Sequence, residues 1–137
     1  MRGMRSDRLG RQTRAVSTKI VRSFYFAFAG VWYLLRTQRN ARIELAIGAG
    51  ACLLAAWLGI RDPVRWAILV FAIALVLILE GLNTAIECAI DLASPGIHPL
   101  AKAAKDLAAG MVLIAAIASV IVGLLILGPA LWNRIAR

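Results

Sequence analysis

The sequence lacks the features with which many soluble proteins bind phosphate groups or metal ions. It has no glycine-rich G-x-x-x-x-G-K-S/T loop, and Gly48 and Gly50 lie in the middle of an apolar run. A phosphate site would therefore have to use side chains and a metal ion rather than a backbone cradle. Only two cysteines occur, Cys52 and Cys88, without partners at metal-ligand spacing, and we expect both to be small buried hydrophobic residues.

Charged residues are also scarce, at 17% of the chain, whereas hydrophobic residues make up 61% and the mean hydropathy is +0.80. A soluble domain of 137 residues has too much surface to bury that much apolar side-chain area. The composition excludes an ordinary water-soluble domain and predicts an integral membrane protein.

The order of polar and apolar segments predicts an all-α fold with one surface helix and three membrane spans. Residues 1–13 are basic and polar and contain two glycines, which is typical of a flexible tail. Residues 14–36 repeat apolar side chains at three- and four-residue steps, as an amphipathic interfacial helix does. The spans are predicted at residues 43–60, 64–91 and 99–131, the third with a cytoplasmic extension, so residues 14–137 form one membrane domain.

Basic residues predict the orientation of these spans. Ten of the 16 Lys and Arg residues lie between Arg2 and Arg42, before the first span. This distribution indicates a cytoplasmic N-terminus, a C-terminus on the opposite side of the membrane, and attraction to an anionic membrane surface. Nucleic acid is excluded as a partner, because no soluble basic domain is left once the spans are removed.

Four of the seven acidic residues lie near the predicted cytoplasmic ends of the second and third spans. Three carboxylates and one amide fall on one narrow face of a helix that turns about 100° per residue; they belong to Glu80, Asn83, Glu87 and Asp91. Carboxylates in or near hydrocarbon are costly and need partners or a function. Carboxylate and amide oxygens also suit Mg²⁺ that bridges to phosphates.

A second polar strip begins the third span. His98, Lys102 and Lys105 share a helix face by their spacing, and Asp106 lies beside it. Two interpretations remain open for the two polar strips. The carboxylates and lysines could form an ion-pair network that holds the helices together, or they could form a metal–phosphate site, in which lysines suit the phosphates.

The run Glu80-Gly-Leu-Asn83-Thr-Ala-Ile-Glu87-Cys-Ala-Ile-Asp91 resembles the signature of the prokaryotic diacylglycerol kinase family. The run His98-Pro-Leu-Ala-Lys102-Ala-Ala-Lys105-Asp106-Leu-Ala-Ala-Gly110 extends the resemblance and is particularly similar to the undecaprenol kinase branch. The segment Asn40-Ala-Arg42-Ile43 and the three-span layout agree, so the resemblance covers roughly residues 19–128.

The resemblance implies a homotrimeric lipid kinase with active sites shared between subunits. Such an enzyme uses ATP and Mg²⁺ to phosphorylate undecaprenol or, as the alternative, diacylglycerol. Glu80 would be the general base, Asn83 would organise the site, and Glu87 would bind the metal ion and contact ATP. Further ATP contacts are expected from Lys19, Asp91, Gly96, Ile97, His98, Lys105 and Asp106. Glu80 and Lys102 are the candidate contacts with the lipid.

The sequence departs from the family pattern at the second metal ligand. Gln38 stands where the family often has a carboxylate, and it offers a carbonyl oxygen without charge. Glu44 is a second candidate for this role, although it could equally be an interfacial residue. Phe26 stands near a position where some members have a tyrosine, so no contact is inferred for it.

Two functions from other classes compete with the kinase. A small oligomeric transporter would use intramembrane carboxylates to carry ions or protons, but the acids cluster at one face of the membrane rather than at mid-depth. A non-enzymatic assembly factor would use the polar strips only for oligomerisation. Stabilisation of the protein by nucleotide against heat would separate the kinase from both.

Overall fold

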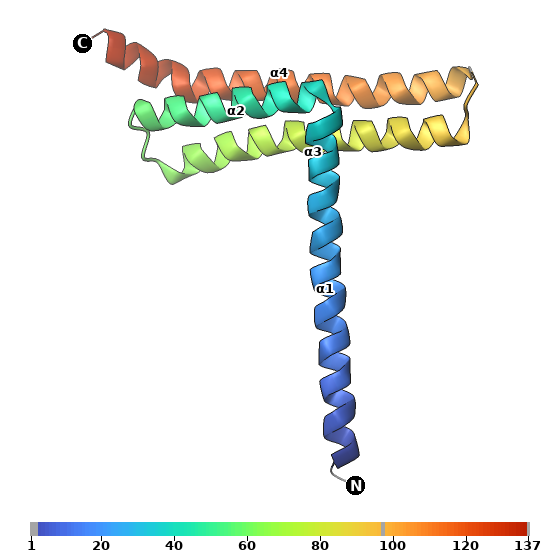
Figure 1. Cartoon of the computed structure of the whole chain (residues 1–137). Helices are drawn as coiled ribbons and strands as arrows, with labels where there is room; N and C mark the ends of the chain where they lie inside the picture. The colour runs from blue at the N-terminus through green and yellow to red at the C-terminus, as the bar shows by residue number, and fades with distance from the viewer. Residues whose placement is uncertain (1–2, 97, 137) are drawn as a thin grey trace. The chain divides into compact units, whose positions relative to one another are not determined.

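A computed structural model describes residues 3–96 and 98–136, with side chains from Lys19 onward. Its helices are α1 (Gly3–Thr37), α2 (Arg39–Trp57), α3 (Pro63–Ala93) and α4 (Pro99–Ile135) (Figure 1). Within the described residues there is no strand, which confirms the predicted all-α class. The chain divides into two compact units, Met1–Thr37 and Gln38–Arg137.

The first unit is one unbroken helix of 35 residues, α1. It begins at Gly3, whereas the sequence predicts a tail over residues 1–13 and a helix over residues 14–36. Residues 4–13 contain no proline and are rich in Arg, Met, Leu and Gln, which are good helix formers, so nothing in this segment stops the helix. From Lys19 onward most side chains are exposed, including the aromatic residues Phe24, Tyr25, Phe26, Phe28, Trp32 and Tyr33.

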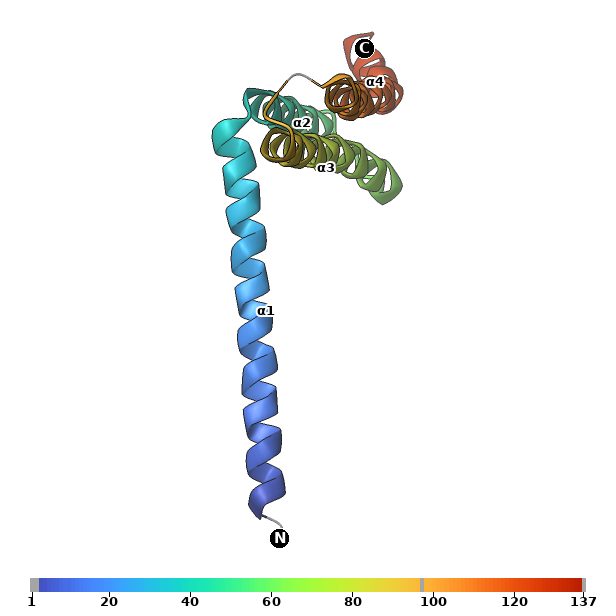
Figure 2. The same cartoon turned by 90° about the vertical axis from the view of Figure 1, so that its right-hand side faces the viewer.

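The second unit contains three helices that lie alongside one another, with α3 packed against both α2 and α4 (Figures 1 and 2). The connection between α2 and α3 lies at the same end as the C-terminus, and the connection between α3 and α4 lies at the other end (Figure 1). The α3–α4 hairpin is longer than α2, with helices of 31 and 37 residues against 19.

Two of the described helices, α3 and α4, are long and apolar enough to cross a membrane. The predicted first span does not reach this standard. It forms α2 at Arg39–Trp57 instead of residues 43–60, and Arg39, Arg42 and Glu44 interrupt its apolar sequence. A helix of 19 residues is about 28 Å long, close to the thickness of the hydrocarbon core. The predicted first span, and with it the three-span topology, therefore stays a prediction.

Local capping explains where the helices of this unit begin and end. The side chain of Asp62 accepts a hydrogen bond from the Val64 amide at 2.9 Å, and Pro63 occupies the first helical position of α3. The end of α2 is marked by Gly59, whose φ of 73° lies in the left-handed region that favours glycine. At the other end of the chain, α4 continues through Pro129 to Ile135, past the predicted end at residue 131.

The core of the unit is small and apolar. Ala55, Leu69 and Ile126 form its buried centre, one residue from each helix. Of the two cysteines, Cys52 is half-buried and Cys88 is exposed, so the expectation that both are buried is wrong for Cys88. Cys88 lies on α3 at a position that the other helices of the unit leave exposed.

Candidate active site

The buried face of α3 changes from apolar to polar along its length. Leu69, Ala72 and Val76 are buried at helical spacing, and the next residue on this face is Glu80, which is only 4% exposed. One turn later Thr84 is also buried, and its hydroxyl donates a hydrogen bond to the Glu80 carbonyl oxygen at 2.9 Å. A carboxylate therefore occupies a position where helix packing would normally place an apolar side chain.

Asn83 and Glu87 form a hydrogen-bonded pair on the same helix. The Asn83 amide nitrogen donates to Glu87 Oε1 at 3.1 Å, and both side chains are half-buried. The other end of the amide, Asn83 Oδ1, is buried and has no hydrogen-bond partner. An unpaired buried acceptor is costly, so this oxygen is available for an incoming donor or cation.

Glu44 on α2 contributes a third carboxylate to this region. Its Oε2 atom is buried and has no hydrogen-bond partner. Glu44 lies close enough to Glu80 for their charges to repel, and the same holds for Glu80 and Glu87. None of the ion pairs in the described part of the chain involves these three carboxylates. We call Glu44, Glu80, Asn83 and Glu87 the carboxylate cluster.

A second group of predicted residues surrounds a hollow of about 420 Å³ at the connection between α3 and α4. Of the predicted ATP and lipid contacts, it is lined by Asp91, Gly96, His98, Lys102, Lys105 and Asp106. The imidazole of His98 accepts a hydrogen bond from the Leu100 amide at 3.2 Å and so caps α4. Ile97, another predicted ATP contact, lies outside the described residues.

The charges around this hollow are paired. Lys105 on α4 forms an ion pair with Asp91 on α3, and Lys102 pairs with Asp106 one turn along α4. The two carboxylates are largely in contact with solvent, since Asp91 and Asp106 are 67% and 63% exposed, whereas Lys105 is 35% exposed. The ion-pair interpretation of the two polar strips thus describes the hollow, whereas the carboxylate cluster has no such pairing within the described residues.

Gln38 is not brought into either group. It has an extended backbone conformation just before α2, and its side chain makes no capping hydrogen bond. Lys19, the predicted ATP contact on α1, is exposed and belongs to the first unit, as does Phe26, for which no contact is inferred.

The donor set of the carboxylate cluster fits a magnesium ion that is shared with a phosphate. Among the described residues, no three His, Cys, Asp or Glu side chains are grouped so as to hold a metal ion by themselves. However, Mg²⁺ is commonly bound by only one or two carboxylates, with phosphate and water oxygens completing its coordination. Asn83 Oδ1 and Glu44 Oε2 are buried oxygen atoms without partners, and Glu87 adds a carboxylate.

Sequence reasoning did not single out Thr84, and it left the orientation of Glu44 open. The spacing of small residues on α2 could have predicted the orientation of Glu44. Ala41, Gly48 and Ala55 are buried at seven-residue intervals, and Glu44 lies on the same side, three residues after Ala41. It therefore faces the other helices of the unit instead of being a purely interfacial residue.

Comparison with known proteins gives one family and several relatives. The model of the prokaryotic diacylglycerol kinase family matches residues 25–127. A diacylglycerol kinase of Synechocystis sp. is 47% identical over 119 residues, which cover 86% of this chain and 67% of that protein. An undecaprenol kinase of Bacillus subtilis is 43% identical over 113 residues, covering 82% of this chain and 91% of the relative. A diacylglycerol kinase of Escherichia coli is 32% identical over 104 residues, or 76% and 84% of the two chains.

Proposed function

The chain belongs to the prokaryotic diacylglycerol kinase family, a family of lipid kinases, and from this membership we propose that it transfers the γ-phosphate of ATP to the hydroxyl group of undecaprenol. The observation that carries the proposal is the carboxylate cluster, an uncompensated group of acidic oxygens beside apolar helices. Such a cluster suits the binding of a cation and the removal of a proton from a lipid alcohol.

Undecaprenol is preferred as the acceptor on two grounds. The segment from His98 to Gly110 is similar to the undecaprenol kinase branch, and the relative of that name is matched over 91% of its own length. Diacylglycerol is the second candidate, because the relative that is 47% identical is a diacylglycerol kinase.

Glu80 is the proposed general base. It lies on the buried face of α3 after a long apolar stretch, so a lipid hydroxyl held at the edge of the hydrocarbon would lie at its level. Asn83 fixes the Glu87 carboxylate through its amide nitrogen and keeps Oδ1 free. A magnesium ion held by Glu87 and Asn83, with Glu44 in place of Gln38, would neutralise charge on the transferred phosphate.

ATP is proposed to bind in the hollow between α3 and α4. Lys105 would exchange its present partner, Asp91, for phosphate oxygens, and His98 and Gly96 would line the nucleotide. Asp106 and, from α1, Lys19 complete the proposed contacts. Glu87 is four residues before Asp91, about 6 Å along the helix axis, so a nucleotide in the hollow could extend its phosphates toward the carboxylate cluster.

We further propose that the protein is a homotrimer in the bacterial inner membrane, with its N-terminus and active site on the cytoplasmic side. The outer surfaces of α3 and α4 support burial in lipid or against other copies, since they expose many large apolar side chains, such as Phe71, Leu113 and Leu125. The excess of basic residues before Ile43 supports the orientation.

Phosphate transfer from radiolabelled ATP tests the function directly. Purified protein in mixed micelles is given Mg²⁺ and either undecaprenol or diacylglycerol, with an EDTA-treated sample as the control. We expect label in undecaprenol that disappears when Mg²⁺ is removed. Label in diacylglycerol alone would replace the proposed acceptor, and label in neither lipid, with the protein correctly assembled, would contradict the kinase.

A further inference from the structure

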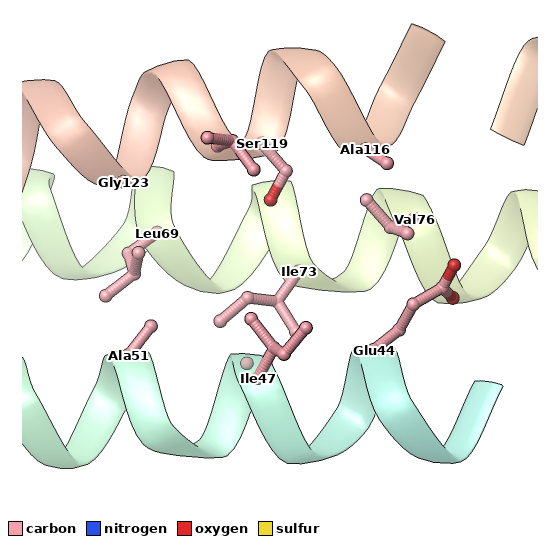
Figure 3. A pocket seen from close by; sticks show the side chains of 11 residues that line it. Glu44, Ile47, Ala51, Leu69, Ile73, Val76, Ala116, Ser119 and Gly123 are labelled. Atoms are coloured by element: carbon pink, nitrogen blue, oxygen red, sulfur yellow. The ribbon is translucent and has the colours of Figure 1, made fainter. Parts of the chain in front are cut away.

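A separate cavity of about 180 Å³ lies between α2, α3 and α4 (Figure 3). Its wall is apolar, and much of it is built from small residues, including Gly48 and Ala51 on α2 and Ala116 and Gly123 on α4. Gly48 is required for this geometry, because a Cβ atom there would lie 2.6 Å from Ile73 Cγ2. The close approach of α2 and α3 at Gly48 thus forms one side of the cavity.

The cavity ends at the carboxylate cluster. Glu44 lines one end, near Val76 and Ala116, while Gly123 and Leu69 lie at the other end (Figure 3). The unpaired Glu44 Oε2 atom is the hydrogen-bond acceptor at that end. Along the rest of the wall Ser119 is the other polar side chain among the lining residues. An occupant that suits this wall is a hydrocarbon chain with one hydroxyl group.

The cavity is accessible from the lipid side and is narrow. Ile47 and Val120, which border it, are 66% and 60% exposed, so the cavity reaches the outer surface of the helices. Its volume of about 180 Å³ is of the same order as that of a protein cavity of about 150 Å³ that accommodates benzene. One short branched hydrocarbon segment fits such a space, whereas two acyl chains joined to a glycerol group do not.

We propose that this cavity binds the hydroxyl end of a single isoprenoid chain and thereby makes a polyprenol the preferred acceptor. The inference rests on the proposed kinase function, because the end of the cavity at Glu44 then places the hydroxyl that is to be phosphorylated beside Glu80, the proposed general base. Ala116, Ser119 and Gly123 act as determinants of lipid specificity through their contacts with the hydrocarbon chain. The rest of the isoprenoid chain leaves between Ile47 and Val120 into the bilayer.

Photolabelling tests occupancy without requiring turnover. The probe is an undecaprenol analogue with a diazirine in the isoprene unit next to the hydroxyl, added to the full-length protein in micelles. We expect covalent label on residues 47–51 of α2 and residues 116–123 of α4, displaced by unlabelled undecaprenol and much less by dioleoylglycerol. Label that falls only on other surfaces would overturn the proposal.

Ala116→Leu and Ala118→Leu form a matched pair for kinetics. Both lie on α4, but Ala116 lines the cavity and Ala118 is exposed outside it. We expect Ala116→Leu to raise the KM for undecaprenol about tenfold, because the added side chain displaces a buried hydrocarbon segment. The KM for ATP should be unchanged in both variants, and Ala118→Leu should behave as the unmodified protein. An equal effect of both substitutions would refute a role for the cavity.

A second variant guards against a folding defect at Ala116. A Cβ atom at Gly123 would meet no atom of another helix within 4 Å, so the backbone of α2 and α3 leaves room for Gly123→Leu to extend into the far end of the cavity. It should impair farnesol and undecaprenol more than the shorter geraniol, a pattern that general destabilisation does not produce. Loss of trimers in these variants, with lipid kinetics unchanged, would identify the cavity as a contact between copies and overturn the proposal.

Photolabelling and the phosphate-transfer assay together separate this inference from the kinase function. Label in the cavity without phosphate transfer would support the lipid site and refute the kinase. Phosphate transfer to undecaprenol without label in the cavity would support the kinase and refute the site.

Discussion

The carboxylate cluster and the hollow at the α3–α4 connection both contain acidic side chains, but they differ in burial and in pairing. In the cluster, Glu44 and Glu80 are enclosed by helices, and within the described residues they have no lysine or arginine partner. In the hollow, Asp91 and Asp106 are exposed, and each is paired with a lysine. Within the described residues the cluster therefore has no compensating positive charge, whereas the hollow is electrically balanced and must exchange partners to bind a phosphate.

This difference divides the expected effects of mutation. Removing a group from the buried cluster should alter chemistry and metal dependence, because its oxygens have few alternatives. Removing a group from the solvated hollow should alter nucleotide binding and change stability little. The predictions that follow test this division, beginning with the largest effect.

Glu80→Gln should abolish measurable turnover, because the amide cannot accept the proton of the lipid hydroxyl. General bases contribute about 10²–10⁴-fold to enzymatic rates, so kcat should fall by at least that range. The measurement is phosphate transfer to undecaprenol at saturating ATP. Thr84→Val, which removes a neighbouring hydroxyl that bonds only to the Glu80 carbonyl oxygen, is the control and should retain activity. Substantial activity in Glu80→Gln would remove Glu80 from the proton transfer.

Lys105→Met should raise the KM for ATP by about tenfold to a hundredfold, since hydrogen bonds to charged groups contribute roughly 1.5–3 kcal/mol. The kcat at saturating ATP should change less. Lys102→Met provides a comparison on the same helix, because Lys102 pairs within α4 and not with α3. A larger effect of Lys102→Met on the KM for ATP would show that Lys102, and not Lys105, makes the phosphate contact.

Glu44→Gln should stabilise the protein in the absence of Mg²⁺ and reduce the stabilisation that Mg²⁺ provides. The substitution removes a charge that repels Glu80 and also removes a candidate metal ligand. The measurement is the midpoint of thermal unfolding in detergent, with and without Mg²⁺ and with a non-hydrolysable ATP analogue. Gln38→Ala is the control and should leave the response to Mg²⁺ intact. If Gln38→Ala lost the stabilisation by Mg²⁺ and Glu44→Gln kept it, Gln38 would be the metal ligand.

Asp91→Asn should change the free energy of unfolding by less than about 1 kcal/mol, because the ion pair that it breaks is exposed to solvent. Chemical denaturation in micelles gives this value, and the KM for ATP measured in parallel reports on Lys105. A loss of several kcal/mol would show that the Asp91–Lys105 pair holds α3 and α4 together, as the ion-pair interpretation requires.

Local sequence signals account for much of the fold. Asp62-Pro63 and His98-Pro99 predict helix starts through a capping side chain and a proline that needs no amide hydrogen, and both helices begin there. The spacing of Glu80, Asn83 and Glu87 predicts a shared face, because the angle between two side chains on a helix follows from their separation in the sequence. The choice of Asp91 as the partner of Lys105 was not predictable, since it depends on the register between two helices.

Other features depended on context that a single sequence does not contain. Cys88 looks like a buried residue by its type, but it lies on the face of α3 that the other helices leave uncovered. The inward orientation of Glu44 depends on which face of α2 meets α3. The cavity that ends at Glu44 requires residues from three helices, and no single segment predicts it.

His98 both caps α4 and lines the hollow between α3 and α4. Its Nδ1 atom accepts the Leu100 amide and begins α4, so in the neutral imidazole the proton resides on Nε2. The ring consequently offers the hollow a donor and not an acceptor, which suits the oxygen atoms of a nucleotide. The orientation of this donor is set by the folding of the helix itself, because the imidazole that caps α4 also lines the hollow.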